Sequence, residues 1–189
     1  MTRTHWLDAT IAYDGSQLRA HWALARTGVV GDVLVGFRGP CRVAAAEIAD
    51  LADVDGPGIA GDDMVHIVWE AFEHSDLLLA AHRQRLLAAQ ARELLAELAP
   101  TAAVTRDGDD LWFAGGKLSI SIATVSPVSA LVHFAVNATP GGAPVATSTL
   151  RDLGVDPVVF GRALLERVAA EQASIADARA KVRPKGEWR

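Results

Sequence analysis

Two neighbouring segments in the middle of the chain alternate strictly between apolar and polar residues, at 117–124 and 131–137. Because successive side chains of a strand point to opposite faces, each segment is predicted to be a strand. If the two strands pair through the turn at 125–129, we expect one face of the pair to be apolar. The polar residues of both segments would then share the other face: Lys117, Ser119, Ser121, His133 and Asn137. That polar face is either solvated surface or the floor of a site.

The remaining elements follow from turn residues and apolar spacing. Short apolar runs predict strands at 6–13, 29–37, 102–106 and 110–114, and a short helix is expected at 17–27. Leucine and alanine at helical spacing predict a long helix at 76–98. Asp156 followed by Pro157 predicts the start of a last helix, which extends to about residue 182. Residues 64–72 fit a strand or a helix, and the sequence leaves both open.

The order of these elements indicates the fold class. Strands and helices are segregated along the chain rather than strictly alternating, which favours an α+β fold with a mixed or antiparallel sheet flanked by helices. We expect one domain over residues 1–183 and a flexible C-terminal tail at 184–189, after Pro184 ends the last helix.

Composition and charge narrow the class of partner. The chain has 189 residues and a net charge of −5, whereas binding to a nucleic-acid backbone needs clustered lysine and arginine, so no nucleic-acid partner is expected. The N-terminus lacks an apolar signal core, and no apolar run is long enough to cross a membrane, so no membrane partner is expected either. Cys41 is the single cysteine, which suggests a reducing, cytoplasmic compartment.

Lys117 and His133 are the strongest candidates for chemistry. A lysine beside a Gly-Gly turn can bind a phosphate or a carboxylate, or stabilise negative charge in acyl transfer. The alternative is an edge-strand lysine that deters aggregation. His133 could act as an acid or base and Asn137 could fix a ligand. The alternative for His133 is a half-buried histidine without a chemical role.

Three turns supply further candidates for ligand binding. Arg38 and Gly39 stand at a strand end, where guanidinium and backbone amides suit an anion. Cys41, next to them, is either a nucleophile or a buried, inert thiol. Tyr13 precedes a polar strand-to-helix turn, which either holds an anion or only caps the helix. Asp110 precedes the segment that leads to Lys117 and could join the same site.

His66, Glu70 and His74 have the spacing of one helix face, and this residue set could bind a metal ion in a metal-dependent hydrolase. The same stretch also alternates as a strand. Even on a helix the three side chains would span about 12 Å along the axis, which is too far for one ion to reach both ends easily. The metal interpretation is therefore the weakest, and no metal ligand is assigned.

Several of these segments together resemble the domain-of-unknown-function 366 (DUF366) family. The segments are 13–19, 36–41, 108–111 and 117–129, followed by His133 and Asn137. The likeness covers nearly the whole chain, and segment 117–129 is its most specific part. The family itself implies no activity.

A more distant likeness is to the biotin- and lipoate-protein ligase and lipoyl-transferase superfamily. It rests on Asp110-Leu-Trp-Phe-Ala-Gly-Gly-Lys-Leu-Ser-Ile-Ser121, followed by His133. The resemblance implies a mixed sheet flanked by helices, akin to a class II aminoacyl-tRNA synthetase core. It also implies that Lys117 contacts an acyl group or an acyl-adenylate, with ATP as a candidate cofactor. Arg38 and Gly39 would correspond to the arginine-glycine loop of the ligand site.

Two features depart from that superfamily. Its ligases carry a longer glycine-rich run than Arg38-Gly39-Pro40. Its octanoyltransferases carry a cysteine downstream of the histidine, and residues 138–150 contain none.

We therefore expect a ligase- or acyltransferase-like enzyme that binds a small carboxylic acid, acyl group or acyl-adenylate through Lys117, assisted by Arg38 and His133. The alternative is a non-catalytic protein that binds a small molecule or nucleotide on the same fold. The oligomeric state stays open, a homodimer included. The ligand-binding candidates are Arg38, Gly39, Ser119, Ser121, Asn137, Asp110 and Tyr13.

Overall fold

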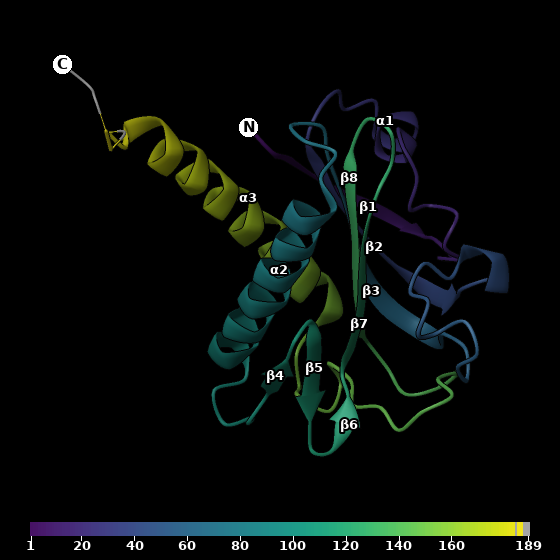
Figure 1. The fold of residues 1–189 in the computed structure, drawn as a ribbon. Helices are drawn as coiled ribbons and strands as arrows, with labels where there is room; N and C mark the ends of the chain where they lie inside the picture. Colours follow the sequence, from purple (N-terminus) through teal and green to yellow (C-terminus); the bar gives the residue numbers. More distant parts are fainter. Residues whose placement is uncertain (184, 187–189) are drawn as a thin grey trace.

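A five-stranded sheet forms the centre of the computed structural model, which describes residues 1–183, 185 and 186 (Figure 1). Its strand order is β1-β2-β3-β8-β7, and a separate three-stranded sheet has the order β4-β5-β6. Within the large sheet β1 is parallel to β2, and the other neighbours are antiparallel. The elements in chain order are β1 (Arg3–Thr10), α1 (Trp22–Thr27), β2 (Val33–Arg42), the 3-10 helix η1 (Ala45–Glu47), β3 (Ala60–Ala71), α2 (Leu77–Leu98), β4 (Thr105–Asp107), β5 (Asp110–Phe113), β6 (Gly116–Lys117), β7 (Ser119–Val125), β8 (Ala130–Asn137) and α3 (Pro157–Lys181).

Helices α2 and α3 cover one face of the large sheet (Figure 1). Asp76 and Asp156 cap them, each accepting hydrogen bonds from backbone N–H groups of the first turn, which a helix start otherwise leaves free. Both long helices predicted from the sequence are therefore confirmed. Side chains from the helices and the sheet form one core, which includes Ile67, Trp69, Leu87, Leu95, Phe134, Phe160 and Leu164.

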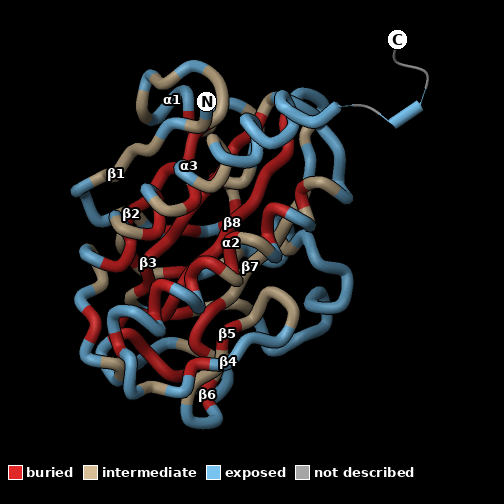
Figure 2. The backbone as a smooth tube through the Cα atoms, turned by 90° about the vertical axis from the view of Figure 1, so that its left-hand side faces the viewer, coloured by how far each residue is buried: buried red, intermediate tan, exposed pale blue. Residues whose placement is uncertain are grey.

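The opposite face of the sheet is covered by α1 and by the loop that joins β2 to β3. A second core lies there, around Tyr13, Phe37, Met64 and Val68. Figure 2 shows the central strands as almost continuously buried, and every residue of β8 is buried. Strands that are covered on both faces bury both sets of alternating side chains.

The antiparallel pairing of β7 with β8 is confirmed. The prediction that the serines of β7 lie on the same face as His133 is wrong. Ile122 pairs with His133, and Ser121 pairs with Phe134. Directly opposed residues of an antiparallel pair share a face. The isoleucines of β7 therefore lie on the side of His133, and its serines lie on the side of Phe134. Alternation shows which residues of one strand share a face, but it does not match faces between two strands that are buried on both sides.

The predicted strand at 117–124 is two strands in different sheets. Lys117 belongs to β6, where it pairs with Trp112. The chain changes sheet at Leu118, whose N–H donates to Leu111 O and whose carbonyl accepts from the N–H of Asn137. Lys117 consequently lies at the junction of the two sheets.

Two further predictions are decided by the structure. The stretch at 64–72, open between strand and helix, lies in β3 almost throughout. The helix expected at 17–27 is only the six residues of α1.

The predicted α+β class, a mixed sheet flanked by helices, is confirmed. Over the described part of the chain, none of the helices has the length and apolar character needed to span a membrane. The tail expected at 184–189 falls mostly outside the described residues, and the single domain over 1–183 stays a prediction.

Candidate functional site

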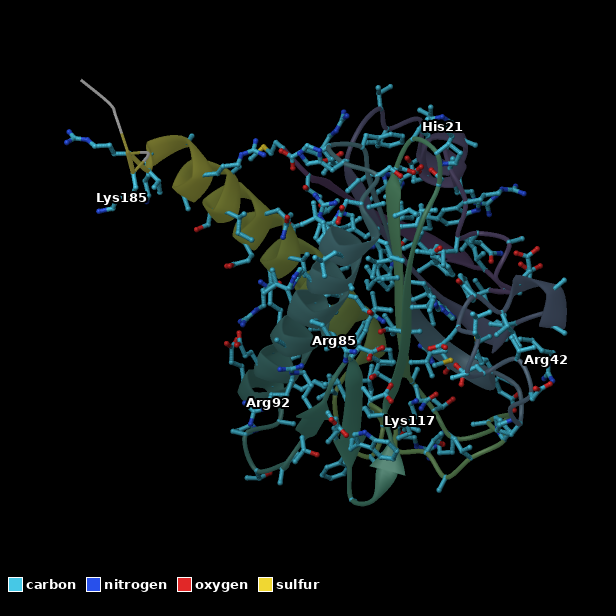
Figure 3. All side chains as sticks on the ribbon, in the orientation of Figure 1. His21, Arg42, Arg85, Arg92, Lys117 and Lys185 are labelled. Carbon is cyan, nitrogen blue, oxygen red and sulfur yellow. The ribbon has the colours of Figure 1, made fainter. Side chains whose placement is uncertain are left out.

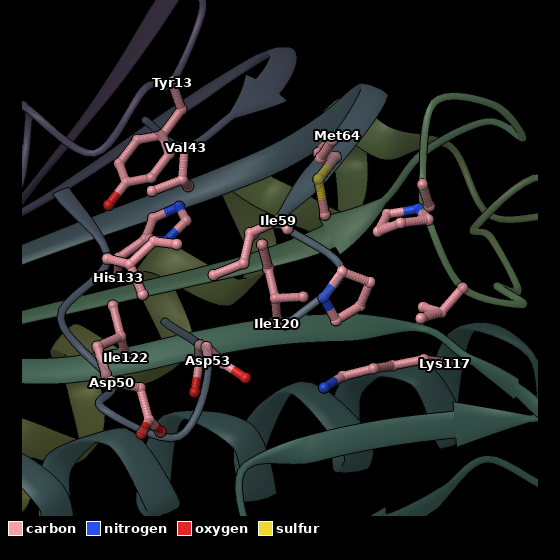
Figure 4. A pocket seen from close by; sticks show the side chains of 18 of the residues that line it. Tyr13, Val43, Asp50, Asp53, Ile59, Met64, Lys117, Ile120, Ile122 and His133 are labelled. Carbon is pink, nitrogen blue, oxygen red and sulfur yellow. The ribbon is translucent and has the colours of Figure 1, made fainter. Parts of the chain in front are cut away.

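A cavity of about 340 Å³ lies on the sheet face that is opposite α2 and α3. Its floor comes from β3, β7 and β8, and its walls come from the loop before β3 and from the loop after β8. Figure 4 shows Lys117 at one end and Tyr13 with His133 at the other, with Ile59, Ile120 and Met64 between them. The strand register agrees, because His133 pairs with Ile122, five residues after Lys117. The cavity is thus a trough of mixed lining, with apolar side chains along its middle, acidic side chains on its walls, and Lys117 and the Tyr13–His133 pair at its ends.

At one end, the ammonium of Lys117 forms an ion pair with Asp110, with 2.8 Å between Nζ and Oδ2. Both side chains are half-buried, and Figure 3 shows Lys117 beside β6 at the end of the large sheet. Burial raises the pKa of Asp110 in spite of the lysine, because desolvation disfavours the charged carboxylate. The lysine offsets part of this effect, because its hydrogen bond and its charge both favour the carboxylate form.

Asn137 fixes the backbone that carries Lys117. Its Nδ2 donates to the carbonyl of Lys117 at 3.0 Å and to the carbonyl of Ser148 at 3.3 Å. Both hydrogen bonds hold β6 against the loop after β8. Asn137 also lines the cavity, and its amide nitrogen holds the backbone of Lys117.

Asp109 lies next to Asp110 and organises the edge of β7. Its carboxylate accepts from Gln84 Nε2 and from Ser121 Oγ, each at 2.7 Å, and it pairs with Arg85, also at 2.7 Å. Ser121 lines the cavity, but its hydroxyl is already engaged in this network.

At the other end, His133 is hydrogen-bonded to His66, with 3.0 Å between His133 Nε2 and His66 Nδ1. The second ring nitrogen of His66, Nε2, lies 3.1 Å from the carbonyl oxygen of Gly39. Desolvation lowers the pKa of His66 to about 4 and lowers the pKa of His133 well below its ordinary value. Both rings are therefore neutral at neutral pH, and neither can act as a cation there.

Tyr13 stacks directly on His133, with ring centroids 3.7 Å apart and planes 8° from parallel. Phe37 stacks on His66, with ring centroids 5.0 Å apart. Burial raises the pKa of the Tyr13 phenol above its ordinary range, so the hydroxyl keeps its proton. The stack holds both histidine rings in fixed orientations.

The structure brings together most of the predicted site residues but places three elsewhere. The cavity is lined by Lys117, His133, Ser121, Asn137, Asp110 and Tyr13. Arg38 is outside it, paired with Asp63 through two hydrogen bonds of 2.7 Å. Gly39 contributes its carbonyl to His66, away from the cavity. Ser119 lies on the helix side, where its hydroxyl accepts from the N–H of Leu111.

His66, Glu70 and His74, considered from the sequence as the weakest alternative and not assigned as metal ligands, do not form a helix face. His66 and Glu70 are on a strand, where residues four apart are about 13 Å from each other. The Glu70 carboxylate instead accepts from the N–H of His21 at 2.7 Å and from Ser129 Oγ at 3.0 Å. Within the described residues, no group of three His, Cys, Asp or Glu is placed to hold a metal ion.

Cys41 is a buried, free thiol. Desolvation raises its pKa to about 12, and the nearby Arg42 lowers it too little to compensate. The thiol is protonated at neutral pH and is no nucleophile. Of the two interpretations of Cys41, the inert thiol holds.

Sequence reasoning missed the loop between β2 and β3 as a wall of the cavity. It supplies both apolar and acidic side chains, including Ile48, Ile59, Asp50 and Asp53. Sequence reasoning also missed the hydrogen bond between His66 and His133. The only signal was that both histidines fall at alternating positions of apolar strands, and pairing between distant strands cannot be read from that.

Comparison with known proteins assigns the chain to a family. The model of the family described as "Domain of unknown function (DUF366)" matches residues 2–183. An uncharacterized protein of Methanocaldococcus jannaschii, MJ0805, is 34% identical over 152 residues, which are 77% of this chain and 68% of that protein. A solved structure of a protein of unknown function from Pyrococcus horikoshi is 40% identical, with a TM-score of 0.94, and the match covers 98% of this chain and 100% of that chain.

More distant structures share the fold. The biotin protein ligase from Aquifex aeolicus, in complex with biotin and ATP, is 14% identical with a TM-score of 0.57, over 89% of this chain and 69% of that chain. The T. acidophilum protein Ta0514, with bound lipoic acid, is 15% identical with a TM-score of 0.56. That match covers 92% of this chain and 86% of that chain. The predicted ligase-like fold is thereby confirmed. The sequence match over residues 2–183 settles the family: the chain belongs to the DUF366 family.

Proposed function

We propose that this protein binds a small carboxylic acid, or its acyl derivative, in the cavity, and that it acts on this ligand as a ligase- or acyltransferase-like enzyme. The carboxylate or acyl carbonyl lies at Lys117, and the apolar chain of the ligand lies along the trough toward His133. The observation that carries the proposal is a lysine ammonium at one end of a cavity whose middle is lined by apolar side chains, among them Ile59, Ile120 and Met64. The fold supports it, because structurally similar proteins hold biotin or lipoic acid.

The volume of the cavity suits such a ligand. Cavities that hold small molecules have volumes of roughly 300–1,000 Å³, and this one has about 340 Å³. Burying one methylene contributes about 0.8 kcal/mol. We therefore expect affinity for straight-chain acids to rise up to about fourfold per added methylene, until the trough is filled.

The charges favour an acid over a nucleotide. Of the described residues that line the cavity, Lys117 is the only lysine or arginine, whereas five acidic residues add negative charge: Glu47, Asp50, Asp53, Asp109 and Asp110. A triphosphate would need several cationic or amide donors. Arg38, the other candidate for anion binding, is neutralised by Asp63. The ligand that fits best is a monoanion.

Lys117 has a direct chemical use in acyl transfer. An ammonium beside an acyl carbonyl stabilises the negative charge that develops on its oxygen when a nucleophile attacks. The described lining of the cavity contains no cysteine, so we expect the acyl group to pass directly to an acceptor without a thioester on the enzyme.

The test is a thermal-shift titration with three carboxylic acids: octanoic acid, lipoic acid and biotin. At a ligand concentration of about 100 times Kd, the melting temperature of the wild type should rise by about 5–10 °C. Lys117→Ala should weaken binding at least tenfold, because a buried carboxylate loses its counter-charge. Lys181→Ala, an exposed lysine at the end of α3, is the matched control and should bind like the wild type. An unchanged melting temperature with all three acids, or a full shift in Lys117→Ala, would contradict the proposal.

A further inference from the structure

Exposed apolar side chains gather at the end of the large sheet where β3 ends and β8 begins. Of the fourteen large hydrophobic side chains that are exposed among the described residues, five belong to segments at this end. Together they form the apolar patch: Val30, Leu77, Leu78, Val125 and Val128, with exposed fractions from 37% to 69%. Apolar residues scattered singly are ordinary on a protein surface, whereas gathered ones mark an interaction site.

Hydrogen bonds hold the three segments of the apolar patch side by side. The hydroxyl of Ser75, just before α2, donates to the carbonyl of Ser126 in the β7–β8 turn. The N–H of Phe72, just after β3, donates to the carboxylate of Asp32 at 2.7 Å and thereby fixes the loop that carries Val30. Figure 1 shows α1, the β7–β8 turn and the start of α2 at the same end of the molecule.

The two leucines of the patch point away from the body of the protein. They occupy the first two positions of α2. Side chains of a helix lean toward its N-terminus, so Leu77 and Leu78 reach beyond the start of the helix. They contribute neither to the cap, which is Asp76, nor to the core, since both are more than half exposed. A single chain therefore leaves these two leucines in water.

Charges of opposite sign flank the apolar patch. On the side of Val30 are Arg3 and Arg26, both exposed and without an ion-pair partner among the described residues. Arg3 lies against this loop, because a Cβ atom added at Gly31 would be 3.5 Å from its Nη2. On the side of the leucines is Asp76, which caps α2 and forms no ion pair within the described part of the chain. The patch therefore has a basic side and an acidic side.

We propose that this protein forms a two-fold symmetric dimer through the apolar patch, with Arg3 and Arg26 of each subunit near Asp76 of the partner subunit. A surface that meets its own copy has to be complementary to itself. In this arrangement the apolar centre covers its own copy, and each basic side meets an acidic side. The inference is independent of the proposed function, because none of the patch residues lines the cavity.

The test is sedimentation equilibrium of the wild type and of Leu78→Asp. The wild type should sediment at twice the 20.0 kDa mass of one chain. Leu78→Asp should raise the dissociation constant of the dimer at least tenfold, because a carboxylate would lose its water in the apolar centre. The matched control is Val159→Asp, outside the patch: Val159 is 55% exposed in the first turn of α3, where an aspartate is equally well accommodated. This control should dimerise like the wild type.

Arg26→Glu tests the charged sides of the patch. The change places acidic groups on both sides, so the dissociation constant should rise at least threefold, and the increase should shrink at high salt. Arg151→Glu changes an exposed arginine of the loop after β8 and is the control. It should leave the dissociation constant unchanged.

A wild type that remains a monomer at every concentration tested would overturn the inference and would assign the patch to a different protein. A dimer that Leu78→Asp leaves intact would also overturn it, because the interface would then lie elsewhere. An unchanged dissociation constant in Arg26→Glu would overturn the two-fold arrangement. If circular dichroism shows that Leu78→Asp does not fold, Val128→Asp in the β7–β8 turn makes the same test.

Discussion

At the scale of single residues, hydrogen-bond partners decide which polar side chains are available to a ligand. Arg38 and Lys117 are both cations that the sequence singles out. Arg38 is held by two hydrogen bonds to Asp63, which also accepts from Thr139. Lys117 has one ion pair, to a carboxylate whose pKa is raised by burial. Arg38 is therefore committed to the fold, whereas Lys117 has a single ion pair and lines the cavity.

We expect Arg38→Ala to lower the free energy of unfolding by about 1 kcal/mol at pH 7, since a charge-assisted pair is lost and the arginine is 40% exposed. The arginine lowers the pKa of Asp63, so the pair is stabilising above the ordinary aspartate pKa of about 3.9. This contribution is lost as the pH falls through the lowered pKa of Asp63. Urea unfolding at pH 7 and in strong acid checks the difference.

The control is Arg42→Ala, which removes a more exposed arginine 3.6 Å from Asp62. We expect no measurable change in that variant. If Arg38→Ala lowers the free energy of unfolding by the same amount at pH 7 and in strong acid, the ion pair with Asp63 is not the cause of the loss.

The chemistry of several residues could be predicted from the sequence, but their partners could not. Lys117, His133 and Asn137 were singled out by their places on alternating segments, and all three line the cavity. The predicted role of Arg38 depended on its having no carboxylate beside it. Asp63 is 25 residues away in the chain, and only the pairing of β2 with β3 brings it there.

At the scale of elements, glycine allows α3 to approach β1 and β2 closely. A Cβ atom added at Gly161 would lie 2.4 Å from the Trp6 ring, and one added at Gly36 would lie 2.7 Å from the same ring. Such distances are shorter than non-bonded carbon atoms tolerate. The indole thus fits into a notch that the two glycines leave between helix and sheet.

Gly161→Ala should therefore destabilise the protein by about 1–3 kcal/mol through overpacking. Helix propensity alone would predict a gain of about 1 kcal/mol for this change, so the sign of the effect distinguishes the two causes. Chemical denaturation followed by circular dichroism measures it. Ser174→Ala, at an exposed position of α3, is the control and should be neutral or slightly stabilising. A stabilised Gly161→Ala variant would refute the close packing.

Element boundaries were predictable where a local signal existed. Asp156 and Pro157 mark the start of α3 in the sequence, and the structure agrees. The division between β6 and β7 has no such signal. It arises because the backbone of Leu118 pairs with Leu111 of β5 on one side and with Asn137 of β8 on the other. Neither pairing can be read from the residues next to Leu118 in the sequence.

At the scale of the whole molecule, the large sheet separates the face that packs against α2 and α3 from the face that carries the cavity. Helices α2 and α3 fill one face with apolar side chains, and the other face carries the cavity. The α+β class followed from the order of elements. The position of β3 between β2 and β8 did not, because it depends on contacts between segments far apart in the chain. That position is what brings His66 to His133.

The central claim is that a carboxylic acid binds at Lys117. The chain has three lysines, Lys117, Lys181 and Lys185, so carbon-13 labelling at lysine Cε gives one resonance for each. Titration with octanoic acid should shift the Lys117 resonance in a saturable way and leave the other two unchanged. An unchanged Lys117 resonance at saturating acid, or equal shifts at all three lysines, would contradict the account.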